Sequence, residues 1–262
     1  MPWSEEIALR CKALEAVATD PRATRGMPLL VRLDGRAFHT YTRGMRRPYD
    51  ERLSRCMIET TKALVKDSQA RVGYTQSDEI TLLFWADPAF PSSEFPFDGR
   101  FQKLTSVLAG LASAQFALLA YDALPEKRGQ VPHFDARAWS VPTTELAVEA
   151  VAWRVADARK NSIAMAAQSV YSHKQLLNKG SDEQLRMLRE AGIDWPLYPD
   201  FFRVGSFIRR VNVQVQIDDE ERLRIPEKHR PDSGTMVMRS RMMEVTPPAV
   251  LTWDWLLTGV TP

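Results

Sequence analysis

Two aspartates stand where apolar runs of the chain meet expected turns. Asp34 follows the run 29–33, and Asp78 lies in the polar tetrad 76–79 that precedes the run 80–85. Two carboxylates held about 4 to 6 Å apart repel each other, so such a pair is stable mainly when a cation lies between them. Magnesium fits this place, because it takes one or two carboxylates together with phosphate oxygens and water. The pair therefore predicts a site at which divalent cations hold a triphosphate.

Gly35 directly follows Asp34. A glycine allows a sharp backbone turn, which can expose a carbonyl to metal and the next amides, up to Phe38 and His39, to phosphate. With two metals about 4 Å apart, one lowers the pKa of an attacking hydroxyl while the other neutralises a leaving pyrophosphate. The expected chemistry is phosphoryl or nucleotidyl transfer.

The Asp-Gly-Arg triplet that begins at Asp34 is a weak signal by itself. The chain repeats it at 98–100, after a proline-rich loop, where a helix N-cap before Phe101 is the better interpretation. For Asp34 the corresponding alternative is a strand-ending turn that the aspartate caps. The matching acidic hairpin around Asp78 favours the metal site.

Apolar periodicity predicts the elements that position these acids. Strands are expected over 28–33, 71–74, 80–85 and 134–141. Helices are expected from Asp50 onward and over 101–124. The order βαββαβ suits an α/β (α+β) fold, a ferredoxin-like palm domain over residues 1–140 with helices on one face of the sheet. Many polymerases and nucleotide cyclases share this architecture, which alone does not fix function. Adjacent central strands would bring the two aspartates together.

The remaining half, 141–262, is predicted to pack on the palm as a C-terminal extension. Helices are expected over 143–171 and 182–191, and strands over 207–217 and 235–245 are expected to form a small β element. A further helix is expected near the N-terminus, over 4–18. Basic groups of this half, among them Arg209 and Arg210, fit either phosphate binding or a solvated face.

Composition limits the setting and the partners. The 262 residues are 44% hydrophobic and 26% charged, which is typical of an ordered globular protein. The net charge is only +2, so a polyanionic partner must be met by local patches. Cys11 and Cys56 offer neither a disulfide framework nor zinc spacing. With a charged N-terminus and an apolar stretch, 107–120, too short to span a membrane, we expect a cytoplasmic protein without a membrane partner.

Five sequence blocks follow one another over about 130 residues. They are Val31 to Arg36 continuing through Phe38-His39, Arg47-Pro48-Tyr49-Asp50, Tyr74 to Glu79, Phe134-Asp135-Ala136-Arg137 and Trp153 to Asp157. In this order they resemble the tRNA(His) guanylyltransferase family and its Thg1-like relatives, and the chain looks closer to the bacterial-type members. The resemblance implies a 3′-to-5′ polymerase that adds nucleotides, GTP and others, to the 5′ end of tRNA or tRNA-like RNA.

The resemblance also implies roles for individual residues. Two magnesium ions on Asp34, Asp78 and the Gly35 carbonyl would hold the incoming triphosphate, and Glu79 would support catalysis. The nucleotide contacts implied in this way are Gly35, Arg36, Ala37, Phe38, His39, Arg47, Asp50 and Ser77. Arg47 stands where the family usually has lysine, an exchange that keeps the charge but changes the hydrogen-bond geometry.

Arg100, Lys103 and Arg137 match basic residues that in the family meet the RNA 5′ end and the nucleotide that activates it. Without the family, Arg100 and Lys103 would be read as a solvated helix edge. Such cations are needed because a 5′-monophosphate is unreactive until ATP adenylylates it, or until a 5′-triphosphate serves as electrophile. The 3′-hydroxyl of the incoming nucleotide then attacks the RNA 5′ phosphate.

One block departs from the eukaryotic pattern. Residues 159–166 replace the family's His-Ile-Asn-Asn-Leu-Tyr-Asn-Thr, and Asn161 is the like-for-like match that survives. Because that block helps the eukaryotic enzymes handle histidine tRNA, its loss favours template-dependent 5′-end repair over addition of a G at position −1. Asn161, and Lys174 in the segment 171–180, are possible RNA contacts; a polar helix residue and an ordinary helix end are the alternatives.

Two other functions compete with the polymerase. A nucleotidyl cyclase shares the palm and the metal chemistry, and an inactive RNA-binding module would keep only the fold. Intact Asp34, Asp78 and Glu79 argue against the inactive module, and Arg100 with Lys103 favours a second polyphosphate, which a cyclase does not need. Family members are typically tetramers, so a homotetramer is implied; the apolar helix 101–124 fits an interface or burial against its own sheet.

Overall fold

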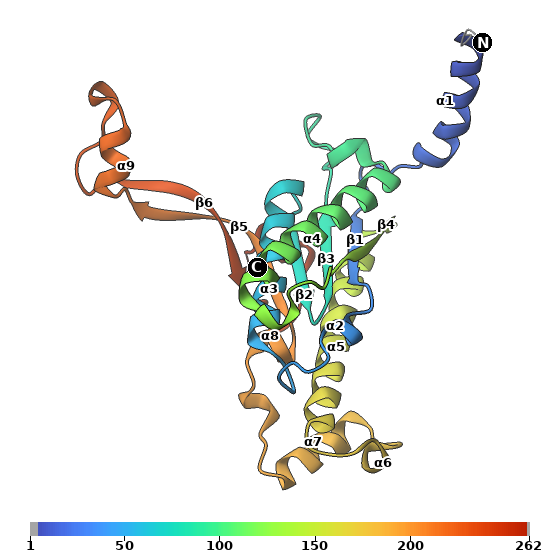
Figure 1. Cartoon of the computed structure of the whole chain (residues 1–262). Helices are drawn as coiled ribbons and strands as arrows, with labels where there is room; N and C mark the ends of the chain where they lie inside the picture. The colour runs from blue at the N-terminus through green and yellow to red at the C-terminus, as the bar shows by residue number, and fades with distance from the viewer. Residues whose placement is uncertain (1–4, 261–262) are drawn as a thin grey trace.

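A six-stranded sheet forms the centre of the molecule (Figure 1). The computed structural model describes residues 5–260. The strands are β1 (Leu29–Gly35), β2 (Val72–Gln76), β3 (Glu79–Phe84), β4 (Phe134–Ser140), β5 (Ser206–Gln216) and β6 (Met236–Val245). They are ordered β4-β1-β3-β2-β5-β6, and every neighbouring pair is antiparallel. The first four strands have the predicted palm order, with the β2–β3 hairpin between two helices.

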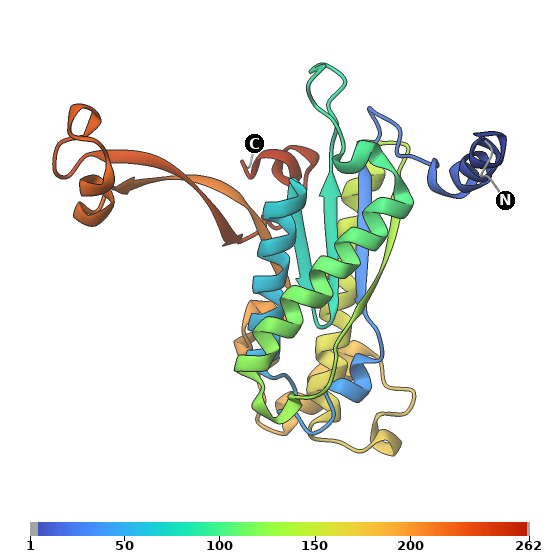
Figure 2. The same cartoon turned by 45° about the horizontal axis from the view of Figure 1, so that its top comes forward.

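Helices α3 (Glu51–Ser68) and α4 (Phe101–Ala123) cross one face of the sheet (Figure 2). Both were predicted, and their apolar stripes explain their position. On α4 the buried residues recur every fourth position, from Leu104 to Ala120, as a helix that lies flat on a sheet requires. They meet Leu29, Val31 and Leu33 of β1 in the largest hydrophobic core.

Helix α4 is longer than its apolar stretch suggested. It has 23 residues and is long and apolar enough to cross a membrane by length and composition. The prediction that this segment is too short was therefore wrong. A core helix passes the same test, and the stripe of α4 belongs to the core, whereas Leu118 and Tyr121 on its other side are exposed.

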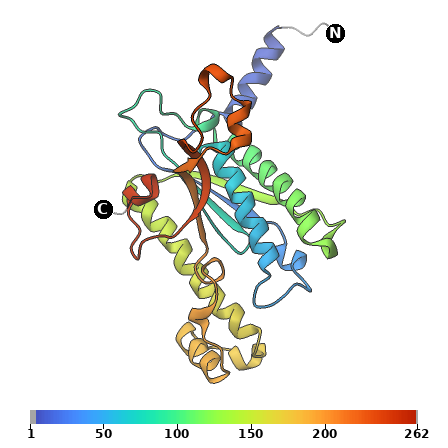
Figure 3. The ribbon, with the colours of Figure 1, turned by 90° about the vertical axis from the view of Figure 1, so that its left-hand side faces the viewer.

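The opposite face of the sheet is covered as well. Helix α5 (Thr144–Gln168) and the short α10 (Trp253–Thr258) pack there, and Figure 3 shows α5 on the other side of the strands from α3 and α4. Leu30 and Leu83 point from the sheet toward this second core. The prediction of helices on one face was thus incomplete, because alternate residues of the buried central strands are apolar on both faces.

The two C-terminal strands do not form a separate β element. β5 pairs with β2 over Ser206–Ile208, so it continues the palm sheet, and β6 follows as the next strand. Beyond this pairing the β5–β6 ribbon, with α9 (Asp219–Arg224) at its tip, reaches away from the body (Figure 1). The boundary near residue 140 stays a prediction, but the sheet runs across it.

The remaining helices lie outside the sheet. They are α1 (Glu5–Thr19), α2 (Phe38–Tyr41), α6 (His173–Leu176), α7 (Ser181–Glu190) and α8 (Asp200–Arg203). α1 buries none of its residues, and position 4 of its predicted span lies outside the described residues. α7 and α8 pack with the end of α5 around Ile163, Leu188, Trp195 and Phe202, in a third core.

Candidate functional site

Asp34 and Asp78 meet at one end of the sheet. The β1–β3 register places Asp34 opposite Glu79, and Asp78 is the hairpin residue immediately before it. The backbone N–H of Gly35 donates to the Asp78 carbonyl over 3.0 Å, which joins the end of β1 to the hairpin. The structure thus brings together the two aspartates that the sequence singles out.

The electrostatics of this end favour a bound cation. Burial, with smaller contributions from the negative charges of Asp34 and Glu79, raises the pKa of Asp78 to about 6, although the Ser77 hydroxyl donates to it at 3.1 Å. Neither aspartate forms an ion pair with a residue in the described part of the chain. A divalent cation between them would offset the repulsion that the fold imposes.

The two acids that flank Asp34 each have an arginine. Asp34 lies opposite Asp135 of β4 as well as Glu79 of β3, so the three share one face of the sheet. Glu79 accepts a hydrogen bond from the buried guanidinium of Arg154 on α5, and Asp135 lies 3.9 Å from the Nε of Arg137. Arginines thus offset part of the charge of the flanking carboxylates, whereas Asp34 and Asp78 have no such partner among the described residues.

Arg154 belongs to the block 153–157 that carries the family resemblance, but the sequence alone predicts no role for it. It also lies 3.4 Å from the carboxylate of Asp157, which in turn accepts from the side-chain amide of Asn161 at 3.1 Å. These residues are spaced by three and four along α5, which places them on one helix face. That spacing beside the acidic hairpin was the signal for Arg154 as a positioning residue.

The segment after Gly35 is shaped to offer its amides to an anion. Ala37 has a left-handed backbone (φ 57°) and precedes the short α2. The N–H groups of Ala37, Phe38 and His39 have no hydrogen-bond partner among residues 5–260. A Cβ at Gly35 would lie 2.4 Å from the Phe38 ring, so this close turn requires glycine. Successive free amides of this kind form a concavity for phosphate.

The core holds this segment in place. The Phe38 ring lies 5.3 Å from that of Phe116 on α4 and 5.2 Å from that of Phe134 on β4. On the solvent side, Arg36 donates its backbone N–H to the His133 carbonyl and its guanidinium lies 3.1 Å from the His133 ring Nε2. A buried ring on one side and an arginine contact on the other fix the turn.

Asp50 has a structural role at the start of α3. Its buried carboxylate caps the helix by accepting from the Arg52 backbone N–H at 3.1 Å and from the Arg52 guanidinium at 2.8 Å. These hydrogen bonds lower its pKa despite burial. Arg52 in turn pairs with Glu126 at 2.6 Å. A contact of Asp50 with a nucleotide base stays a prediction, while Arg47 is exposed and makes no ion pair within the described chain.

Arg100 and Lys103 lie far from the aspartates in the same chain. Both lie at the start of α4, beside the segment that leads into β1. The backbone of Arg22 forms an isolated antiparallel β-bridge with that of Arg100, and the N–H of Ala23 donates to the Gly99 carbonyl. α4 reaches the level of the site at Ser113. The hydroxyl of Ser113 accepts from the backbone N–H of Phe134, which lies opposite Gly35 in the sheet. Ten helical residues rise about 15 Å. Within one chain Arg100 and Lys103 are therefore not brought to the two aspartates, and their contact with the RNA 5′ end stays a prediction.

The reason is the direction of α4, which starts at the far end of the sheet and ends near the site. At its near end the buried Lys127 donates to the Arg43 carbonyl at 2.8 Å and lies 5.6 Å from the Tyr41 ring centre. This lysine was not singled out from the sequence. Of the predicted RNA contacts, Arg137 is two strand positions from Asp135, whereas Asn161 and Lys174 are exposed on α5 and α6.

The donor set suits a hard cation that brings other ligands with it. Within residues 5–260 no group of three or more histidine, cysteine, aspartate or glutamate side chains is placed to hold a metal ion. Asp34 and Asp78 supply two carboxylates, and the Gly35 carbonyl is the third protein oxygen expected there. Magnesium commonly takes its remaining ligands from water and phosphate, so these residues fit it.

Asp78→Asn should stabilise the metal-free protein at pH 7.5 but not near pH 4. The pKa of Asp78 is raised to about 6 in the folded state, so its stabilising protonated form is lost as the pH rises from about 4 through 6. We expect a gain of about 2 kcal/mol at pH 7.5, measured by urea unfolding in EDTA. The exposed Asp232→Asn is the control, and equal stability of Asp78→Asn and parent at pH 7.5 would contradict the raised pKa of Asp78.

Arg154→Gln should destabilise the fold by about 3 kcal/mol, because it leaves two partly buried carboxylates unpaired. The double variant with Glu79→Gln should recover part of this loss in a urea-unfolding cycle. Arg186→Gln is a matched control, since Arg186 pairs with Glu183 and Glu190 on the exposed surface of α7. A cost for Arg154→Gln no larger than that of the control would rule out its positioning role.

Known proteins share both the sequence and the fold. A family model described as tRNAHis guanylyltransferase (Thg1) matches residues 10–142. The chain is 26% identical over 215 residues to the tRNA(His) guanylyltransferase of Saccharomyces cerevisiae, covering 73% of this chain and 88% of the yeast protein. It is 28% identical over 203 residues to an uncharacterised protein of Acanthamoeba polyphaga mimivirus, covering 69% of each.

Solved structures agree with this relationship. A bacterial tRNA(His) guanylyltransferase (Thg1)-like protein in complex with ATP is 34% identical, with a TM-score of 0.73, over 78% of this chain and 88% of that chain. One in complex with GTP is 27% identical, with a TM-score of 0.70, over 92% and 91%. The predicted α+β architecture is confirmed by these likenesses. The chain belongs to the tRNA(His) guanylyltransferase (Thg1) family and is a nucleotidyltransferase of the kind that its bacterial Thg1-like members represent.

Proposed function

We propose that this nucleotidyltransferase extends the 5′ end of tRNA or tRNA-like RNA in the 3′-to-5′ direction, as template-dependent repair. The observation that carries the proposal is the crowded Asp34–Asp78 pair beside the free amides of Phe38 and His39. A cation site next to an anion site is what a metal-bound triphosphate requires. GTP and other nucleotides are the proposed donors, and ATP the proposed activator.

In this proposal the chain's own residues bind and orient the triphosphate. Two magnesium ions on Asp34, Asp78 and the Gly35 carbonyl would supply Lewis-acid chemistry when bound. The amides that follow Gly35 bind phosphate oxygens, and the exposed Arg47 contributes a positive charge to the triphosphate. The ion pair with Arg154 offsets part of the charge of Glu79 and keeps the hairpin in position.

The proposed reaction asks little covalent chemistry of the protein. The 3′-hydroxyl of the incoming nucleotide forms a phosphodiester bond to the RNA 5′ phosphate, while the bond to the leaving AMP or pyrophosphate breaks. Negative charge grows on the transferred phosphate, and cationic side chains such as Arg137 offset it. We expect no covalent intermediate with the enzyme.

Repair is favoured over G addition by the surroundings of the block 159–166. Ile163 is fully buried, Ser162 donates to the Arg203 carbonyl at 3.1 Å, and the Arg159 guanidinium lies 5.3 Å from the Trp195 ring centre. These side chains hold α5 against α8 and the segment before it. Selective addition of a G at position −1 to histidine tRNA is the second candidate, and a nucleotidyl cyclase is the third.

Arg100 and Lys103 can serve the 5′ end only if they reach the site of another copy. Their position at the far end of α4 therefore favours the homotetramer that the family resemblance implies. The exposed Leu118 and Tyr121 on the outer side of α4 offer apolar surface for such an assembly. The cytoplasmic setting and the absence of a membrane partner stay predictions.

Incubation with 5′-truncated tRNA, magnesium, ATP and labelled nucleotides tests this function, with product length as the readout. Extension that follows the opposite base is expected for the parent. Asp34→Ala and Asp78→Ala should each abolish it and remain folded, because removing one crowded carboxylate relieves repulsion; the exposed Asp232→Ala is the control.

Other products would point elsewhere. A single G added to intact histidine tRNA would support the guanylyltransferase activity instead of repair. Cyclic nucleotide formed without RNA would contradict both. Full activity of Asp34→Ala or Asp78→Ala with magnesium would refute the metal assignment.

A further inference from the structure

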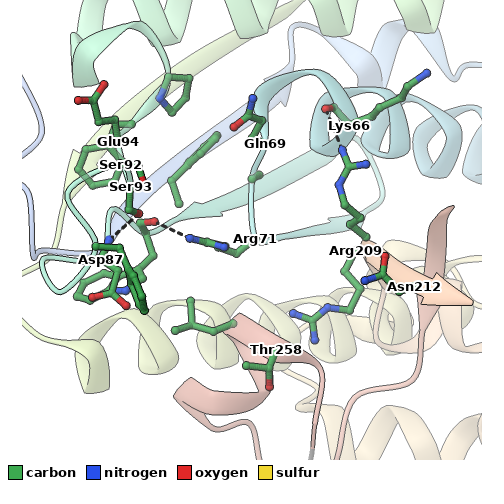
Figure 4. A pocket seen from close by; sticks show the side chains of 18 residues that line it. Lys66, Gln69, Arg71, Asp87, Ser92, Ser93, Glu94, Arg209, Asn212 and Thr258 are labelled. Carbon is green, nitrogen blue, oxygen red and sulfur yellow. Dashed lines mark hydrogen bonds between the residues drawn. The ribbon is translucent and has the colours of Figure 1, made fainter. Parts of the chain in front are cut away.

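A hollow of about 960 Å³ opens at the other end of the sheet, where β2 begins and β3 ends (Figure 4). The end of α3, the loop 85–96, β5 and the end of α10 line it. A second hollow of about 530 Å³ lies between α3, α4, β5 and β6 and shares Lys66 and Arg210 with the first. We call the two together the basic groove. Strand β3 separates the first hollow from Asp34 by roughly 17 Å, at about 3.4 Å per residue.

The residues that line the basic groove include more cations than acids, unlike the nearly balanced chain as a whole. Six cations line it, Lys62, Lys66, Arg71, Arg209, Arg210 and Arg241, against the acids Glu59, Asp87 and Glu94. Lys62 pairs with Glu59 at 2.7 Å. The other five cations form no ion pair with any residue of the described chain, although the whole protein has a net charge of only +2.

Backbone carbonyls orient the arginines without neutralising them. Arg209 is 3% exposed and donates to the carbonyls of Trp255 at 2.8 Å and Leu256 at 2.9 Å. Arg210 donates to the Lys66 carbonyl at 3.4 Å, and Arg71 to that of Trp85 at 3.3 Å. Carbonyl dipoles at helix ends offset only part of a full charge. The exposed guanidinium groups of Arg71 and Arg210 are well suited to phosphate, while the buried Arg209 adds positive charge behind them.

Aromatic rings stand beside these cations. Phe90 in the loop 85–96 is 62% exposed, and the half-buried Trp85 is held edge-on by Trp253, with ring centres 5.2 Å apart. Figure 4 shows Lys66, Arg71 and Arg209 around the hollow, from three different elements. Grooves that bind nucleic-acid strands combine such a positive track with rings on which bases stack.

We propose that the basic groove binds the sugar-phosphate backbone of the RNA substrate, at a distance from the 5′ end under reaction. This inference rests on the proposed function and names the surface that holds its substrate. Two adjoining hollows that share Lys66 and Arg210 extend further than one nucleotide, which favours a polynucleotide over a free nucleoside triphosphate. The RNA thus has a second anchor at the opposite end of the sheet from Asp34.

The test uses the full chain and the double variant Lys66→Gln with Arg71→Gln, both exposed positions. Fluorescence anisotropy of labelled 5′-truncated tRNA, titrated at several salt concentrations, gives affinity and salt slope. Loss of two phosphate contacts should lower the slope by about 1.5 and weaken binding about 20-fold at 0.15 M salt. Arg10→Gln with Lys12→Gln on the exposed α1 removes the same charge outside the groove, and should leave both values near those of the parent.

Binding of GTP, measured by equilibrium dialysis, separates the possible outcomes. Weaker RNA binding with unchanged GTP binding in the groove variant supports the proposal. Unchanged RNA affinity and slope overturn it while the proposed function stands. Loss of GTP or ATP binding with normal RNA binding would show a free nucleotide as the occupant and overturn the proposal. A parent that binds no RNA would overturn the proposed function and this occupant together.

Discussion

The repulsion between Asp34 and Asp78 is the constraint on which the rest of the site depends. The β1–β3 register and the hydrogen bond from Gly35 to the hairpin hold the two acids together whether or not a cation is present. Burial, with a smaller contribution from the nearby charge of Asp34, raises the pKa of Asp78 in this arrangement. The surrounding sheet, with a hydrophobic core on each face, holds the two acids close together although their charges repel.

Neighbouring residues limit the electrostatic repulsion mainly to Asp34 and Asp78. Arg154 offsets part of the charge of Glu79, and Phe38 packs into the core while the amides after Gly35 remain without partners in the described chain. Helix α5 then links the hairpin to α7 and α8, where its far end is buried around Ile163. In this enzyme, strand pairing fixes the acid pair that we propose as the cation site, and α5 joins it to a helical region whose sequence departs from the eukaryotic block.

The sequence was informative where local pattern decides structure. Apolar periodicity located the palm strands and α3 and α4, and the two strand-end aspartates proved to be neighbours. Properties that arise from long-range packing were missed: the second covered face, the pairing of β5 with β2, and the direction of α4 that takes Arg100 away from Asp34. Asp50 shows the same limit, because a cap and a ligand contact use the same carboxylate and residue type alone does not separate them.

The most direct measurement of the central claim is the titration of the Asp78 carboxyl carbon by NMR, assigned through its loss in Asp78→Asn. Metal-free protein should give a midpoint near the raised pKa of about 6. Addition of magnesium and GTP should move that midpoint well below its usual range, because the ionised form is then favoured. An ordinary midpoint near 4 in the metal-free protein, or one that magnesium and GTP leave unchanged, would contradict an acid pair held ready for a cation.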